Sequence, residues 1–235
     1  MRQVTRAALS ALVLLISQTY SQGAGQAPVL NTEPLTLTQV FRLDATYTDP
    51  QHGVTFRYPS AWEATTQFAY HPPALTESGT AKPIAGFGYS ERGFPREGVV
   101  GPYTQTNLEG FGIVYSAVPA ASGAECESKA ASVSDSNKHS HIVLGHRSFS
   151  AYETGETFMS QSISGTLYVT YASHTCYLFE TDVAAVSLGV VDDVQGLTLA
   201  QGRYIEARLL DIMKSVRIVP SRRRGPGPDE LFKPR

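Results

Sequence analysis

The chain has 235 residues, of which 42% are hydrophobic and 10% aromatic, which is enough to close one sizeable core but too little for two independent ones. Charged residues make up 17%, and the formal net charge is −2, so the composition encodes no general attraction to nucleic acid or to an anionic membrane. We therefore expect one domain and no nucleic-acid partner.

The N-terminus has the residue order of a secretory signal peptide. Arg2 and Arg6 precede an apolar run from Ala7 to Ile16, and small and polar residues follow. This run is about half of the roughly twenty residues needed to cross a bilayer, so no permanent membrane anchor is expected. Small residues that suit signal peptidase occur at two places, Ser21 with Gly23 and Gly25 with Ala27.

These features predict the organisation of the chain. Residues 1–27 hold the signal peptide and the start of a leader, and residues 28–38 continue as a flexible leader. Residues 39–219 form the single domain, and residues 220–235 form a disordered basic tail. The mature protein is expected to be soluble and exported, either periplasmic or extracellular.

Cys126 and Cys176 are the only cysteines. In an oxidising compartment an even pair most simply forms one disulfide, and neither cysteine has the CxxC spacing of a redox motif. Two buried free thiols are the alternative.

The first half of the domain predicts a β-hairpin. Apolar and polar residues alternate from Phe41 to Thr48 and again from Val54 to Tyr58, with a turn at residues 49–53 between them. Pro59 ends the second strand because it has no amide hydrogen to donate. The proline-rich segment 65–107 predicts irregular connections around a short strand at 85–90. A strand at 112–118 and a helix from Ser122 to about Val133 follow.

The second half predicts an antiparallel meander and a closing helix. Strand-like runs separated by glycine or polar turns occur at 142–144, 148–153, 157–163, 167–172 and 176–181. Apolar residues then recur at helical spacing between Arg203 and Lys214, and residues 216–219 predict a last short strand. Gly86-Phe87-Gly88 and Gly110-Phe111-Gly112 echo each other, and we interpret them as two strand ends rather than a repeat.

Two stretches resemble the PsbP-like family. The first contains Gly53, Val54, Phe56, Tyr58, Pro59, Ser60 and Trp62, and the second runs from Met213 to Ile218. The resemblance implies an α+β fold, an α/β/α sandwich around a central, mainly antiparallel β-sheet. It implies no catalytic residue, because Gly53, Phe56, Tyr58, Pro59 and Trp62 are all residues that shape or fill the fold.

Three histidines are the most distinctive group of metal-ligand side chains. His139 and His141 are two residues apart on a predicted strand, so they point to one face and could share Zn²⁺ or Mn²⁺. His146 follows five residues later. Ile142 and Leu144 have the opposite parity and belong in the core, which places His139 and His141 on the solvent side. A solvated strand end is therefore the competing interpretation.

Other constellations give weaker signals. No GxSxG elbow is present, and we interpret the acid pairs Glu125 with Glu127 and Asp192 with Asp193 as surface charge. Tyr168 and Tyr177 have the opposite parity to Leu167 and Leu178, so tyrosines could be buried or could line an open sheet face.

These observations predict an exported, non-catalytic binding or assembly module that acts on a protein partner of unknown identity. No cofactor is expected. A small-ligand or metal-ion binding domain, using the histidines or an aromatic groove, is one alternative. An unrecognised hydrolase with its residues in segment 65–107 is another.

Overall fold

The computed structural model describes residues 35–66, 78–91, 101–134, 139–157, 159–189 and 194–219. All of these residues fall in one compact unit, residues 32–235. The predicted signal peptide, most of the leader and the basic tail lie outside the described residues. Within the described residues, no helix is long and apolar enough to span a bilayer.

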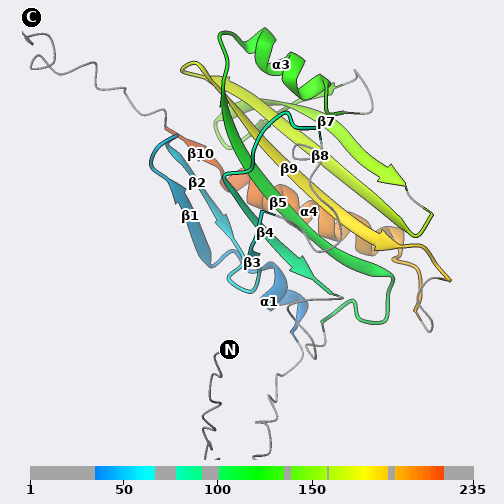
Figure 1. Cartoon of the computed structure of the whole chain (residues 1–235). Helices are drawn as coiled ribbons and strands as arrows, with labels where there is room; N and C mark the ends of the chain where they lie inside the picture. Colours follow the sequence, from blue (N-terminus) through cyan, green and yellow to red (C-terminus); the bar gives the residue numbers. More distant parts are fainter. Residues whose placement is uncertain are drawn as a thin grey trace, which may run out of the picture. The chain divides into compact units, whose positions relative to one another are not determined.

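Seven antiparallel strands form the large sheet, in the order β3-β4-β5-β9-β8-β7-β6 (Figure 1). The strands are β3 (Glu63–Ala64), β4 (Ala85–Ser90), β5 (Leu108–Pro119), β6 (His139–Leu144), β7 (Arg147–Thr157), β8 (Gln161–Ala172) and β9 (Thr175–Val186). From β6 to β9 each strand pairs with the next along the chain, which is the predicted meander.

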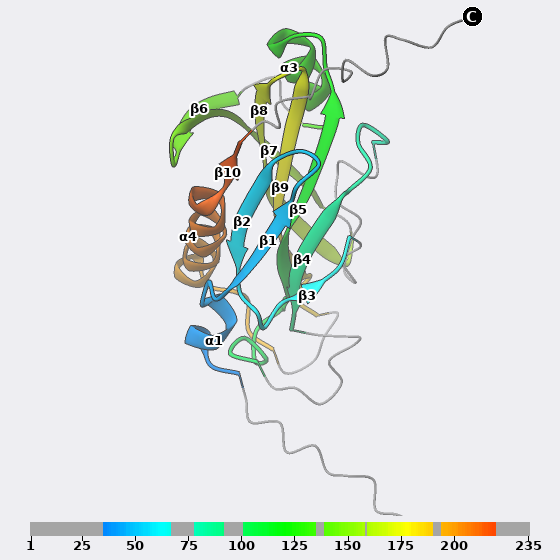
Figure 2. The ribbon, with the colours of Figure 1, turned by 90° about the vertical axis from the view of Figure 1, so that its left-hand side faces the viewer.

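A second sheet of three strands, in the order β1-β2-β10, lies beside the large one (Figure 2). It consists of the hairpin β1 (Ala45–Asp49) and β2 (Val54–Tyr58), together with the short β10 (Arg217–Ile218). Gly53 has a φ of 68°, a conformation that glycine adopts without steric cost. The hairpin predicted from alternation is therefore present.

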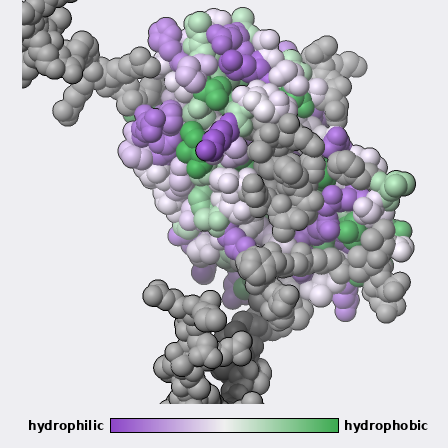
Figure 3. Space-filling model, viewed as in Figure 1, coloured by the Kyte–Doolittle hydropathy of each residue, from purple (hydrophilic) through white to green (hydrophobic). Residues whose placement is uncertain are grey.

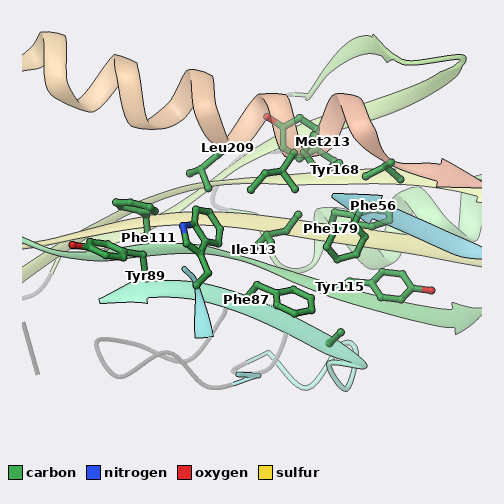
Figure 4. Close-up of a cluster of buried hydrophobic side chains, with 14 of the residues drawn as sticks. Phe56, Phe87, Tyr89, Phe111, Ile113, Tyr115, Tyr168, Phe179, Leu209 and Met213 are labelled. Carbon is green, nitrogen blue, oxygen red and sulfur yellow. The ribbon is translucent and has the colours of Figure 1, made fainter. Parts of the chain in front are cut away.

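Helix α4 (Leu199–Ser215) and the small sheet cover one face of the large sheet, which we call the α4 face. Thr198 caps this helix through a capping box with Gln201. Figure 4 shows Leu209 and Met213 directed from α4 onto the aromatic side chains of the sheet. The core on this face includes Phe56, Phe87, Phe111, Ile113, Tyr115, Tyr168, Tyr177 and Phe179. Tyr168 and Tyr177 are therefore buried and do not line an open face.

Helix α3 (Gly123–Ala131) packs on the opposite face, which we call the α3 face. Ser122 caps this helix, as predicted, by accepting from the amide of Glu125. A second core lies beneath it and includes Cys126, Tyr152, Leu167, Val169, Cys176 and Leu178. The predicted Cys126–Cys176 disulfide is present and ties α3 to β9. With helices on both faces of an antiparallel sheet, the α+β prediction is confirmed.

Two local predictions are wrong. Phe41 is not in a strand but ends helix α1 (Leu37–Phe41), where its ring stacks on Phe111 with centroids 5.1 Å apart. Residues 157–163 do not form one strand, because Thr157 ends β7 and Gln161 begins β8. Phe41 and Ile163 are nevertheless buried, whereas Met159 is exposed on the turn between β7 and β8.

The repeated Gly-Phe-Gly motifs are direct neighbours across β4 and β5. Gly88 pairs with Gly112, while Phe87 pairs with Ile113 and Tyr89 with Phe111. The four side chains that flank Gly88 and Gly112 in these two strands are buried on the α4 face. The two motifs thus lie inside paired strands, not at two strand ends, and their glycines lie on the α3 face.

Candidate functional site

The predicted metal ligands His139 and His141 lie on the exposed α3 face of β6, the edge strand of the large sheet. Their rings have centroids 5.0 Å apart and are nearly perpendicular. Leu144, of the opposite parity, is buried in the core on the α4 face. The predicted placement of the histidines is therefore confirmed, but the proposed metal binding is a separate question.

A carboxylate network from α3 lies directly beside these histidines. Ser150 Oγ donates to Glu127 Oε1 at 2.6 Å, and the Tyr152 hydroxyl donates to Oε2 of the same carboxylate. Ser150 Oγ is also 3.4 Å from His141 Nδ1, and the His139 ring stacks on the Tyr152 ring with centroids 5.0 Å apart. Five side chains from three elements therefore form one connected polar cluster, which we call the His–Glu cluster.

Two hydrogen bonds fix the position of the Glu127 carboxylate in the His–Glu cluster. Burial, and then the hydrogen bond to Glu127 and its negative charge, raise the pKa of Tyr152. The phenol thus stays protonated and keeps donating to Glu127. Among the described residues, no three histidine, cysteine, aspartate or glutamate side chains surround one metal position, so any ion bound here would have two imidazole ligands and water.

Sequence reasoning missed three members of this cluster. Glu127 was interpreted as surface charge together with Glu125, and the structure separates the two roles. Glu125 is on the outer side of α3, where it pairs with Lys129 at 3.1 Å, whereas Glu127 turns toward Ser150 and Tyr152. The sequence did contain one signal that Glu127 lies close to the sheet, because it directly follows Cys126, which the disulfide holds against β9. The neighbouring pair Asp192 and Asp193 lies outside the described residues.

A second candidate site is an aromatic groove between the β1–β2 hairpin and β4. It is an open groove of about 650 Å³, and its lining consists of Tyr47, Tyr58, Ala64, Thr65, Thr66, Ile84, Ala85, Gly86 and Phe87. Tyr58 stacks on Phe87 with ring centroids 3.8 Å apart, and Tyr47 meets the same ring edge-on at 5.5 Å. Ile84 is 38% exposed at the rim.

The groove offers apolar surface with phenolic hydroxyl groups. Burial, and then the negative charge of Asp49, raise the pKa of Tyr47, so this phenol remains a neutral hydrogen-bond donor. Aromatic side chains with a polar tip are enriched in protein interfaces because they bury a large area and can still form a hydrogen bond. This chemistry suits a binding surface better than acid–base catalysis.

Most residues of the PsbP-like resemblance have structural roles. Phe56 and Trp62 are buried, and the Trp62 indole donates to the carbonyl of Val40 at 2.7 Å. Pro59 is buried at the end of β2. Tyr58 is the exception, because it is half-buried and lines the groove.

A pair of acids is buried on the α3 face of β9. Glu180 and Asp182 are 1% and 4% exposed, and they share the parity of Leu178 in the same strand. Burial, and then the charge of Glu180, raise the pKa of Asp182 well above its ordinary value. Asp182 Oδ2 and Thr154 Oγ1 have no hydrogen-bond partner. Burial therefore favours the neutral form of the Asp182 carboxyl group.

On the face seen in Figure 3, which carries α3, hydrophilic and hydrophobic residues alternate in small groups. Within the described residues there is no broad apolar patch on this face.

Comparison with known proteins gives weak structural similarities only. No family model and no curated protein matches the chain. One similar structure is a protein from Bacteroides thetaiotaomicron, with 12% identity over 75% of this chain and a TM-score of 0.39. The match covers 48% of that protein, so the chain spans about half its length.

Two further structures match over nearly their whole length. LpqN of Mycobacterium tuberculosis, described as involved in cell envelope biogenesis, has 11% identity, covers 80% of this chain and 100% of its own, and gives a TM-score of 0.40. The Ran-binding protein Mog1p of Saccharomyces cerevisiae has 6% identity and a TM-score of 0.42. The match covers 75% of this chain and 96% of Mog1p. LpqN and Mog1p are of the PsbP-like and Mog1 fold type, and none of the three descriptions names PsbP. Similarity at this level does not assign the chain to a family.

Proposed function

We propose that this chain is an exported, non-catalytic module with a PsbP-like type of fold that binds a protein partner through the aromatic groove. The observation that carries the proposal is the groove itself, where Tyr47, Tyr58 and Phe87 converge beside the exposed Ile84. Among the described residues, the lining contains no carboxylate, imidazole or amine, so these side chains suit contact with an apolar or aromatic segment of a partner.

Export is supported by two independent features. The signal-like N-terminus predicts translocation, and the Cys126–Cys176 disulfide is of the kind that persists in oxidising compartments. The intact mass of the protein recovered from its native cells tests this part of the proposal. Export predicts loss of a segment ending near residue 23 or 27, whereas a full-length cytoplasmic protein with reduced cysteines would contradict it.

The groove is tested by site-specific photo-cross-linking in the native cells. A photoreactive phenylalanine analogue at position 84 should capture a defined partner, and the same analogue at position 159 should not. Met159 is fully exposed on the β7–β8 turn, so it reports random encounters. Capture of identical species from both positions, or of none from position 84, would refute the groove as the binding surface.

A matched pair of point variants separates binding from stability. Ile84→Glu places a charge at the groove rim without removing a core side chain, so the variant should no longer co-purify with the partner identified by the cross-link, while its unfolding temperature stays nearly unchanged. Met159→Glu should leave both unchanged. If Ile84→Glu retains the partner at wild-type yield, the partner binds elsewhere.

A further inference from the structure

We propose that His139 and His141 bind a divalent transition-metal ion at the edge of the large sheet, with Glu127 as the outer carboxylate that orients His141 through Ser150. The proposal concerns the α3 face and is independent of the aromatic groove. The sequence alone suggested the two histidines as ligands, and the fold adds Glu127, Ser150 and Tyr152 beside them.

The strand geometry brings the two imidazoles together. Residues two apart on a strand point to the same face, and here the two ring centroids are 5.0 Å apart. Metal–nitrogen distances are about 2.0–2.1 Å, so modest side-chain rotations bring one nitrogen of each ring to a shared ion. Both histidines are exposed, so an ion reaches them directly from solvent.

The position of Glu127 is fixed more firmly than that of an ordinary surface glutamate. The adjacent Cys126 is bonded to Cys176 on β9, which holds this turn of α3 against the sheet. Ser150 and Tyr152 each donate a hydrogen bond to the carboxylate. The Glu127 carboxylate is therefore held beside the two histidines by contacts on both of its oxygens.

Ser150 connects the Glu127 carboxylate to His141, one of the two proposed metal ligands. Its Oγ is 2.6 Å from Glu127 Oε1 and 3.4 Å from His141 Nδ1. Glu127 thus lies one hydrogen-bonded group away from the ion, which is the place of an outer-shell carboxylate in metal sites. His139 is oriented separately, because its ring stacks on Tyr152.

The ligand set selects the class of ion. Imidazole nitrogens prefer zinc, copper and nickel, whereas calcium and magnesium require oxygen ligands. Two imidazoles leave coordination positions for water or for a ligand from another molecule. Because imidazole binds a metal only in its neutral form, binding should weaken as the pH falls.

Isothermal titration of the tag-free protein with Zn²⁺ and Ni²⁺, and with Mg²⁺ as the control ion, tests the site. The wild-type protein should show saturable binding of one Zn²⁺ or Ni²⁺ and none of Mg²⁺. The double variant His139→Ala/His141→Ala should lose that binding, and Glu127→Gln should weaken it about tenfold. His174→Ala is the matched control and should bind as the wild type does, because His174 lies on the β8–β9 turn beside residue 120, before the start of α3, and outside the His–Glu cluster.

Broadening of individual histidine ring proton signals by substoichiometric Cu²⁺ gives a second readout, which identifies the histidines that bind the ion first. Signals of His139 and His141 should broaden first, and that of His174 last. Thermal unfolding of each variant without metal checks that the fold is kept. Absence of saturable binding by the wild type, or equal binding by the double variant, overturns the proposal and leaves the groove proposal unaffected.

Discussion

Gly165 of β8 lies directly opposite Asp182 of β9, and the carboxyl group of Asp182 occupies the space that a side chain at position 165 would need. A Cβ there would collide with Asp182 Oδ1 and would lie 2.5 Å from Thr154 Oγ1 and 2.8 Å from the carbonyl oxygen of Thr181. The glycine is therefore required by close approach on the sheet face and not by backbone conformation.

Gly165→Ala should destabilise the protein by about 1–3 kcal/mol, the usual range for overpacking. The Thr181 carbonyl cannot move without disturbing the β8–β9 ladder, so relaxation of side chains relieves only part of the collision. Urea unfolding followed by circular dichroism measures the change.

Gly202→Ala is the matched control for this substitution. Gly202 lies inside α4, and a Cβ there would meet only Leu197 Cδ2 at 4.0 Å. Because alanine favours the helical conformation more than glycine does, the free energy of unfolding of this variant should increase by about 0.5–1 kcal/mol. Equal stability changes at positions 165 and 202 would contradict the close-approach explanation.

The buried Asp182 predicts an unusual dependence of stability on pH. Its folded-state pKa is raised above the ordinary value of 3.8 by burial and by Glu180, so the unfolded chain loses this proton more easily. The stabilising contribution is fully present below the unfolded pKa and is lost as the pH rises toward the folded pKa.

Asp182→Asn should remove this loss while keeping the shape of the side chain. The free energy of unfolding of the variant minus that of the wild type should therefore increase as the pH rises above the ordinary pKa of 3.8. Urea titrations at several pH values measure this difference. A difference that is constant with pH, or that shrinks as the pH rises, would show that Asp182 is already ionised in the folded protein.

The strands of the two sheets also show what the sequence could and could not predict. Alternation identified the hairpin, because one face of β2 is buried and the other is not. The same method divided β7 and β8 at glycines, since Gly155 and Gly165 were interpreted as turn signals. In the structure both lie within strands, and a Cβ on Gly155 would be 2.6 Å from the carbonyl oxygen of Ile163.

Tertiary burial was the main feature that local patterns could not supply. Glu180 and Asp182 alternate with Phe179, Thr181 and Val183, a pattern that predicts a solvated face. Both acids are nevertheless buried. Glu127 likewise lies in a helix with other polar residues, where nothing local distinguishes it. Its role depends on its contact with Ser150 of β7, 23 residues further along the chain. The disulfide was the one long-range contact that residue type alone predicted.

Removal of the disulfide should lower the free energy of unfolding by about 4 kcal/mol, the chain-entropy value for this separation. Cys126 and Cys176 are 50 residues apart and both are buried in the core beneath α3. Cys126→Ala/Cys176→Ala should show this loss in urea unfolding without reductant. The wild type in reductant should approach the variant if the thiols become accessible on unfolding. Alkylation of two thiols in the unreduced wild-type protein would contradict the disulfide.

Asp49 should be the most sensitive residue of the β1–β2 turn. Its Oδ1 accepts from the amides of Gln51 and His52 at 2.9 and 3.2 Å, and its Oδ2 lies 2.6 Å from His52 Nδ1. The buried Tyr115 hydroxyl also donates to Oδ2 at 3.3 Å. Burial acts to raise the pKa of Asp49, but the hydrogen bonds and charge of His52, together with the Gln51 amide, outweigh it, and the pKa is lowered.

Asp49→Ala should cost about 1–3 kcal/mol at pH 7, because it leaves the Tyr115 hydroxyl without that acceptor and frees two turn amides. Since the folded pKa lies below the unfolded one, the contribution of Asp49 is present above the ordinary range and is lost as the pH falls through the folded pKa. The difference in free energy of unfolding between the wild type and Asp49→Ala, measured by urea unfolding, should therefore decrease as the pH is lowered from 7 to 3. Because the same hairpin carries Tyr47 and Tyr58 into the groove, Asp49→Ala should also weaken capture of a partner at position 84. A gap in unfolding free energy that stays constant down to pH 3 would show that the charge of Asp49 does not stabilise the turn.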